Sequence, residues 1–167
     1  MLIRDAAADD MAAVTDIYNA LIDTTTVAWS EEHQTLDDRL AWFAKQRTDG
    51  YPVLVAANDA GTVVGFAAYG SFRGAGRWPG YRYTVEHTIH LDRTVWRAGV
   101  GTALLEALLE RACADGLHVM VGAIDADNTG SIRFHERLGF VEVARMPQVG
   151  RKFDRWLDLV LLQRILD

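Results

Sequence analysis

Two glycines stand one residue apart at the beginning of an apolar segment, "TVWRAGVGTALLEALLERA", that covers residues 94–112. Peptide N–H groups in the first turn of a helix lack an intrahelical acceptor and lie at the positive end of the helix dipole, so they bind phosphate where side chains leave room. Gly99 and Gly101 would leave that room. A strand-to-helix turn that requires a positive φ would also select glycine, and this stretch alone does not separate the two interpretations.

Two widespread phosphate-binding loops do not match this turn. A dinucleotide-binding fingerprint requires a third glycine at position 104, where the sequence has Leu104. A Walker loop requires Gly-Lys-Ser/Thr after four spacer residues, which the turn lacks. The turn must therefore be judged together with the elements that position it.

The elements around the turn alternate between strand and helix patterns. A strand pattern at residues 1–6 precedes an apolar helix pattern, and a second helix begins at Thr35, where Asp38 completes a capping box, and ends near Gly50. The remaining patterns are, in chain order, strands at 51–57, 62–70 and 81–92, a helix from Gly99, a strand at 117–124, a helix to Leu138 with Gly139 as its stop, and strands at 140–146 and 155–166.

This order of elements indicates the fold class. An antiparallel meander that leads into a strand–helix–strand unit predicts an α/β fold with a single mixed, mostly antiparallel sheet of six to seven strands and helices on both faces. No repeat, low-complexity tract or linker divides the sequence, so we expect a single domain over residues 1–167.

The bulk composition excludes several classes of protein. Half of the residues are hydrophobic and 24% are charged, which is typical of a globular protein. The net charge of −6 argues against nucleic acid and anionic membranes as partners. Cys113 is the only cysteine, which excludes an internal disulfide or a thiolate metal cluster, and we expect it to be buried. Early acidic residues and the lack of a long apolar run predict a cytoplasmic protein.

Two stretches together resemble motifs of the GNAT superfamily of N-acetyltransferases. Residues 94–112 resemble its pyrophosphate loop, Gln/Arg-x-x-Gly-x-Gly/Ala, with Trp96 at the first position and Arg97 one place late. "DNTGSIRFHERLGF" resembles the family's later signature, with matches at Asn128, Ser131, His135 and Leu138-Gly139-Phe140. "AYGSFR", "YRYTVEHTIHL", "GLHVMVGAID" and "MPQVGRKFDRWLDL" are similar to the phosphinothricin and methionine-sulfoximine acetyltransferase branch.

The resemblance spans nearly the whole chain and implies a GNAT fold and a homodimer. It also implies direct transfer of an acetyl group from acetyl-CoA, as co-substrate, to the α-amino group of a small amino-acid analogue such as phosphinothricin or methionine sulfoximine or sulfone. Two alternatives remain open. One is acetylation of protein N-termini or other amines, and the other is a coenzyme-A-binding sensor without turnover.

Two residues are the candidates for proton transfer. Acetyl transfer needs a neutral amine, and an α-amino group with a pKa of about 8 is mostly protonated at pH 7. Glu86 matches the glutamate of the family's "VE-H/S" strand, which implies a general base acting directly or through water; a solvated or paired carboxylate is the alternative. His135 stands where the family often has a tyrosine, and it would donate a proton to the leaving thiolate, hold a hydrogen bond, or cap or pack.

The resemblance assigns the remaining candidates to the two substrates. The pantetheine arm is expected to contact the main chain of one strand, at Ile89, His90 and Leu91. The diphosphate is expected at the glycine turn, which comprises Arg97, Ala98, Gly99, Val100, Gly101 and Thr102. Two signature residues, Asn128 and Ser131, are expected to bind pantetheine or nucleotide. A carboxylate clamp and aromatic pocket walls are expected from Arg73, Arg82, Trp29, Phe72 and Tyr83. The alternatives are a helix cap for Asn128, ordinary loop arginines and core aromatics.

Three further features carry separate expectations. "EHTIH" reverses the order of a zinc-binding helix motif and alternates its side chains across a strand, so we predict no metal and expect His87 and His90 to be packed or hydrogen-bonded. We interpret Arg77 as an ordinary loop arginine. Lys152 and Phe153 either reach a neighbouring subunit's site or belong to a solvated hairpin.

Overall fold

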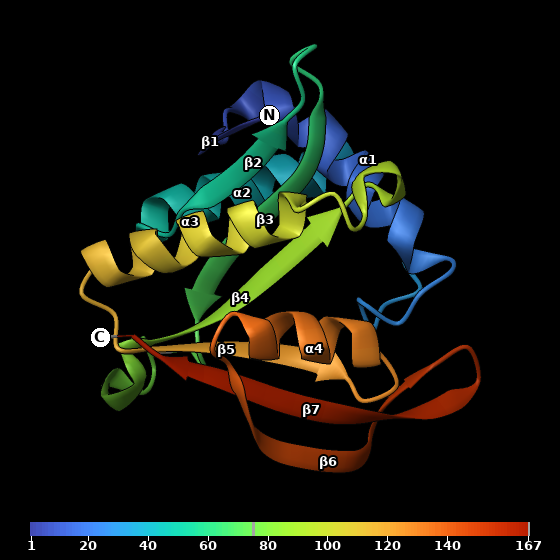
Figure 1. Cartoon of the computed structure of the whole chain (residues 1–167), viewed down its shortest axis with the longest axis vertical. Helices are drawn as coiled ribbons and strands as arrows, with labels where there is room; N and C mark the ends of the chain where they lie inside the picture. Colours follow the sequence, from blue (N-terminus) through green and yellow to red (C-terminus); the bar gives the residue numbers. More distant parts are fainter. Residues whose placement is uncertain (75, 167) are drawn as a thin grey trace. The chain divides into compact units, whose positions relative to one another are not determined.

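The computed structural model describes residues 1–74 and 76–166, and the elements follow the order that the sequence predicts (Figure 1). In chain order they are β1 (Leu2–Asp5), α1 (Met11–Ile22), α2 (Leu36–Asp49), β2 (Val53–Ala57), β3 (Val63–Ser71), β4 (Thr84–Leu91), α3 (Val100–Ala114), β5 (Val119–Asp125), α4 (Thr129–Arg137), β6 (Val141–Lys152) and β7 (Arg155–Ile165). Short 3-10 turns lie at Ala8–Asp10, Pro79–Tyr81 and Arg93–Val95.

The strands of the described residues form one seven-stranded sheet in the order β1-β2-β3-β4-β5-β7-β6. The β1–β2, β2–β3, β5–β7 and β6–β7 pairs are antiparallel, and β4 and β5 are parallel. The predicted mixed, mostly antiparallel α/β sheet is therefore confirmed, with the larger of the two expected strand numbers.

The chain separates into two compact units, and each is assembled from three segments. Unit 1 comprises Met1–Ala20, Gln34–Gly70 and Thr88–Arg111, and unit 2 comprises Leu21–His33, Ser71–His87 and Ala112–Asp167. Strand β4 contributes residues to both units. The expectation of a single domain over the whole chain stays a prediction.

In unit 1, helices cover both faces of the β2–β3 pair (Figure 1). One face carries a core from α1, α2 and the two strands: Met11, Val14, Ile17, Phe43, Val53, Val55, Val63, Phe66 and Ala68. The other face meets α3, because a Cβ at Gly65 would collide with Leu91 and press on Leu104. At the ends of α2, the predicted box between Thr35 and Asp38 and the left-handed Gly50, with φ 77°, are both present.

Unit 2 contains the remaining strands and α4. β6 is longer than the predicted strand 140–146, because it continues to Lys152 through a register irregularity between Met146 and Gly150. Gln148, with φ 54°, lies within that irregularity, and its N–H donates to Asp158 Oδ1 at 2.9 Å. The bulge thus lets the strand pass Pro147, which has no N–H to donate to a ladder.

The expectation that Cys113 is buried is wrong, because this residue is exposed. Along the same helix the buried positions are Leu104, Leu105, Leu108, Leu109 and Ala112. Residue 113 is rotated by about 100° from Ala112 and faces solvent. The helical periodicity of the apolar residues predicted the buried face of α3 correctly. Cys113 is exposed because its position on the helix lies outside that face, although cysteine is usually buried.

Candidate active site

The glycine turn at the start of α3 has the open backbone that an anion site needs. Gly99 has φ 82° and Arg97 has φ 64°, so the glycine at position 99 satisfies a left-handed turn, which was one of the two interpretations. The Ala103 N–H donates to the Gly99 carbonyl at 3.1 Å as α3 begins. The N–H groups of Val100, Gly101 and Thr102 precede that bond and have no intrahelical acceptor.

The turn is also accessible from solvent on its N-terminal side. Arg97, Ala98 and Gly99 are exposed, while Val100 and Gly101 are buried. One backbone group is already used, because the Ala98 N–H donates to the Val95 carbonyl at 3.3 Å. The local geometry is compatible with a diphosphate bound at residues 99–102.

Trp96, which departs from the family's loop pattern, folds back onto the end of β4. Its indole Nε1 donates to the Leu91 carbonyl at 3.2 Å, and the Arg93 guanidinium lies 5.6 Å from its ring. This bond occupies one acceptor position on Leu91, whose main chain is predicted to contact pantetheine. The carbonyl keeps a second lone pair for another donor.

His90, in the same predicted contact, is a core residue of unit 1. Its ring lies 5.6 Å from the Tyr18 ring and 5.3 Å from the Phe66 ring. Burial and the positive charge of Arg39 lower the pKa of His90 to about 4, so the imidazole is neutral at neutral pH. The expectation of a packed histidine is confirmed, and only its main chain is offered to a ligand.

Glu86 lies in the part of β4 that belongs to unit 2, opposite Val121 of β5 in the parallel ladder. It is exposed and alternates with the buried Val85 and His87. Although part of the residue reaches solvent, desolvation by the surrounding protein raises the pKa of its carboxyl. No cation pairs with Glu86 in the described part of the chain, which disfavours the paired-carboxylate alternative. A carboxylate with a raised pKa is a stronger base than an ordinary one.

His87 and His135 form a buried pair in unit 2. Their Nε2 atoms are 3.1 Å apart, and the rings stack at 5.0 Å. His135 Nδ1 lies 2.7 Å from the Ser131 carbonyl, which can only accept, so a neutral His135 carries its proton on Nδ1 and accepts at Nε2 from His87. A Cβ at Gly122 would stand 3.0 Å from His87 Nε2, so the β5 backbone holds the pair from one side.

The environment of His135 bears on its predicted role. Burial lowers the pKa of His135, and the hydrogen bond to Ser131 acts in the opposite direction. The Phe140 ring lies 5.3 Å from His135 and 5.6 Å from His87. Because the only proton of the neutral ring is held by a carbonyl, these contacts favour holding a hydrogen bond over direct proton donation.

Asn128 is the N-cap of α4, since its Oδ1 accepts from the Ser131 N–H at 3.1 Å. The helix-cap alternative for Asn128 is therefore confirmed. Ser131 supplies both this N–H and the carbonyl bound to His135. These two signature residues thus orient the His135 ring as well as starting the helix.

The predicted carboxylate clamp lies in unit 2, between the end of β3 and the start of β4. Arg73 and Arg82 are both exposed, and each guanidinium lies over an aromatic ring, Tyr81 at 5.5 Å and Tyr83 at 4.5 Å respectively. Arg82 also donates to the Pro79 carbonyl at 3.2 Å. The described residues offer neither arginine a carboxylate partner, so both remain available to one.

The aromatic candidates have different surroundings. Phe72 is half-buried and packs edge-on against Tyr81 at 5.7 Å, whereas Tyr83 is exposed. Arg77 lies 5.4 Å from the Trp78 ring, in keeping with an ordinary loop arginine. Trp29 is half-buried and covers Gly150 of β6, where a Cβ would overlap its Cε3 and Cζ3 atoms.

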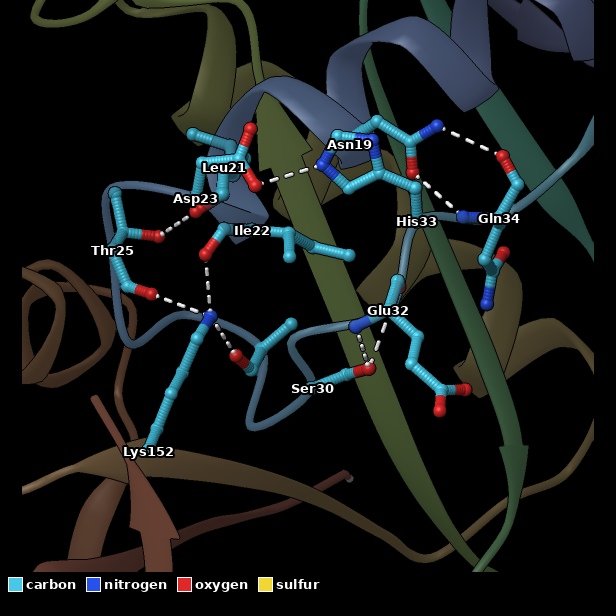
Figure 2. A network of polar contacts seen from close by, with 11 residues as sticks. Asn19, Leu21, Ile22, Asp23, Thr25, Ser30, Glu32, His33, Gln34 and Lys152 are labelled. Atoms are coloured by element: carbon cyan, nitrogen blue, oxygen red, sulfur yellow. Dashed lines mark hydrogen bonds and ion pairs between the residues drawn. The ribbon is translucent and has the colours of Figure 1, made fainter. Parts of the chain in front are cut away.

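Lys152 is buried, and its Nζ donates to three main-chain carbonyls of the same chain (Figure 2). Lys152 therefore fits neither of its two expected settings, because it is not solvated and its ammonium binds this chain rather than a neighbouring subunit's site. Phe153 is exposed, and its expected contact with a neighbouring subunit stays a prediction. Burial lowers the pKa of Lys152, while the charges of Glu31 and Asp23 raise it. Sequence reasoning missed Gly150 altogether, although a glycine inside a strand is a signal of close approach.

The described residues contain neither a candidate membrane span nor a candidate metal-binding cluster. No helix among them has the length and apolar character to cross a membrane. In residues 1–74 and 76–166, no three His, Cys, Asp or Glu side chains gather in a way that would hold a metal ion.

Known proteins with similar sequences and structures identify the class. The sequence matches the acetyltransferase (GNAT) family over residues 14–140. A methionine sulfoximine/methionine sulfone acetyltransferase of Pseudomonas paraeruginosa is 47% identical, covering 99% of this chain and 94% of the relative. A phosphinothricin acetyltransferase of Sinorhizobium meliloti, solved with acetyl-CoA, has a TM-score of 0.94 at 33% identity, covering 99% of this chain and 88% of that one.

A third similar structure is a ribosomal-protein-alanine N-acetyltransferase of Brucella melitensis, with a TM-score of 0.95 and 39% identity over 99% of this chain and 100% of that one. The overall fold is thus shared with structures named as N-acetyltransferases. The chain belongs to the acetyltransferase (GNAT) family and is an acyltransferase.

Proposed function

We propose that this enzyme transfers the acetyl group of acetyl-CoA directly to the α-amino group of small amino-acid analogues of the methionine sulfoximine, methionine sulfone and phosphinothricin type. The support is the 47% identity to an acetyltransferase for the first two compounds and the likeness to a phosphinothricin acetyltransferase solved with acetyl-CoA. Such identity extends over nearly the whole of both chains, so it includes the elements that carry the candidate residues.

Acetyl-CoA would be held by unit 1 residues that fit its chemistry. The N–H groups of Val100, Gly101 and Thr102, with Arg97 beside them, suit a diphosphate, and the main chain of residues 89–91 suits the pantetheine amides. The co-substrate supplies the thioester carbonyl. The remaining task of the protein is to deprotonate and orient the amine.

Glu86 is the proposed general base, and the observation that carries the proposal is its carboxylate, free of an ion pair and with a raised pKa, on β4. It would take a proton from the ammonium form of the acceptor, directly or through one water. The amine can then attack the thioester carbon, and coenzyme A leaves as a thiolate. General-base help of this kind is worth about 10² to 10⁴ in rate.

The other candidates take supporting roles in this proposal. Arg73 and Arg82 would bind the acceptor carboxylate, and Trp29, Phe72 and Tyr83 would wall the pocket. Asn128 and Ser131 would contact pantetheine or nucleotide and orient His135. His135 would act by holding its hydrogen bond to His87 rather than by direct donation to the thiolate.

The test is release of free thiol from acetyl-CoA with a panel of amino acids and their sulfoximine, sulfone and phosphinate analogues. We expect turnover with small carboxylate-bearing amines and a loss of about 10² to 10⁴ in kcat for Glu86→Gln. The rate of the wild type should rise with pH as the base and the amine lose protons. Equal rates for both proteins would remove Glu86 from this role.

A second candidate function rests on the likeness to the ribosomal-protein-alanine N-acetyltransferase. A peptide with an N-terminal alanine, included in the same panel, would be preferred if the acceptor is a protein N-terminus. Binding of acetyl-CoA without turnover on any amine would instead indicate a sensor. Three expectations stay predictions: homodimerisation, a cytoplasmic location, and the absence of nucleic-acid and membrane partners. Light scattering during gel filtration would measure the oligomeric state.

A further inference from the structure

The segment between α1 and α2 carries Trp29 and is held by one strand of unit 2. Helix α1 ends at Ile22, where its last carbonyls have no intrahelical donors. Lys152 Nζ reaches these groups from β6, 130 residues later in the sequence, and donates to the Ile22 carbonyl at 2.7 Å. A cation at the C-terminus of a helix also interacts favourably with the helix dipole.

The same ammonium binds two further carbonyls, of Thr25 and Ala28, each at 2.8 Å. Figure 2 shows Nζ surrounded by the turn that follows Ile22. An ammonium has three N–H donors, so all of them are used, and each fixes a different residue of the 22–28 turn. The ring of the next residue, Phe153, lies 4.8 Å from Lys152 Nζ.

Trp29 follows directly after the last of these carbonyls, and its ring lies on Gly150. Residues 150 and 152 are two apart in β6 and therefore face the same side of the strand. Gly150 has no side chain and so leaves room for the Trp29 ring, and Lys152 supplies the ammonium that binds the 22–28 turn. A third tie is the Phe153 N–H, which donates to Glu31 Oε1 at 2.8 Å.

We propose that Lys152 and Gly150 are positioning residues that place the Trp29 indole as a wall of the acceptor pocket, and that they thereby set recognition of the acceptor amine. The inference rests on the proposed function, which assigns Trp29 to that wall. Neither residue touches the reacting atoms. Lys152 acts on the Trp29 ring through the 22–28 turn, and Gly150 acts on it by direct contact.

The first measurement does not depend on activity. The five tryptophans are labelled with 5-fluorotryptophan, and Trp29→Phe assigns the 19F resonance of residue 29. In Lys152→Met, which keeps the length of the side chain without the ammonium, we expect this resonance to shift and broaden while the other four stay in place. Arg151→Met, at the exposed neighbouring position, is the matched control and should leave the Trp29 resonance unchanged. The Trp156 resonance is expected to shift in this control, because the Arg151 guanidinium lies 5.7 Å from the Trp156 ring.

The second measurement divides acceptor recognition from the rest of catalysis. Because a small misplacement of a positioning group costs up to about 100-fold, we expect Lys152→Met to raise KM for the acceptor by about 10- to 100-fold. The KM for acetyl-CoA should change less than about 2-fold. Gly150→Ala displaces the ring without removing the ammonium, so it should reproduce both results, and it carries the test if Lys152→Met does not fold.

The outcomes are distinguishable from failure of the proposed function. A wild type that acetylates no amino acid would refute that function, while the 19F spectra would still show whether Lys152 and Gly150 hold the Trp29 ring in place. An unmoved Trp29 resonance in both variants would overturn the positioning role. A moved resonance with an unchanged acceptor KM would overturn the assignment of these residues to recognition.

Discussion

Unit 1 buries Arg39 of α2 among aromatic rings, whereas unit 2 buries Lys152 of β6 among backbone carbonyls. The Arg39 guanidinium carbon lies 4.6 Å from the Tyr18 ring centroid, 4.9 Å from that of Trp42 and 5.6 Å from that of Phe66. Two of its nitrogens, Nε and Nη2, have no hydrogen-bond acceptor in the described part of the chain. Lys152, by contrast, uses all three donors on carbonyls.

The difference follows from the two cations themselves. A guanidinium is flat, delocalised and weakly hydrated, so aromatic faces can replace part of its hydration. An ammonium is a compact and strongly hydrated charge, so it is buried only where acceptors replace its water. Arg39 therefore fills space within a core and is partly unsatisfied, while Lys152 organises a turn. The comparison leads us to expect that the two sites respond differently to the same substitution.

The largest expected effect is on the lysine site. Lys152→Met should lower the free energy of unfolding by about 4 kcal/mol, because three carbonyls lose a charged donor. Urea titrations followed by circular dichroism measure this, with Arg151→Met expected within about 0.5 kcal/mol of the wild type. A loss below about 1 kcal/mol for Lys152→Met would show that water satisfies the three carbonyls equally well.

The second effect concerns His90, which feels the charge of Arg39. Its folded pKa of about 4 is below the unfolded value of about 6.5, so the unfolded state binds more protons between these values. Stability from this group is therefore present above about pH 6.5 and falls as the pH drops towards 4, by about 3 kcal/mol. In urea titrations, the free energy of unfolding of the wild type should fall by about 3 kcal/mol more than that of His90→Phe between pH 7 and pH 4. The same pH dependence of stability in both proteins would contradict the lowered pKa of His90.

The smallest effects are expected at Arg39. Arg39→Met should change the free energy of unfolding by about 1 kcal/mol or less, because an apolar side chain relieves two unsatisfied nitrogens. Arg39→Lys should cost about 2 kcal/mol, since the aromatic rings give an ammonium no acceptors. The reverse order of these two variants would mean that charge, rather than the shape of the guanidinium, is what the rings select. Arg39→Met should also raise the pKa of His90, which an acid titration by NMR would detect.

Local features of this protein were determined by the sequence alone. The capping box at Thr35 and the helix-ending glycines at positions 50 and 139 depend on residues within about one helical turn, and the sequence predicted all three. For Gly99 the sequence left two interpretations open, and the structure shows the left-handed turn. The order of strands and helices follows from hydrophobic periodicity in the same way. The spaced residues Asn128, Ser131 and His135 were found through the resemblance of this stretch to the GNAT signature.

Only the tertiary structure decided what the buried polar groups bind. His87 meets His135 across 48 residues, and Lys152 meets Ile22 across 130, and no local pattern records either partner. Gly150 became informative only once Trp29 was seen to lie on it. The physical reason is that a buried donor is defined by the acceptor that the fold brings to it, whereas caps and turns are defined by their own neighbours in the chain.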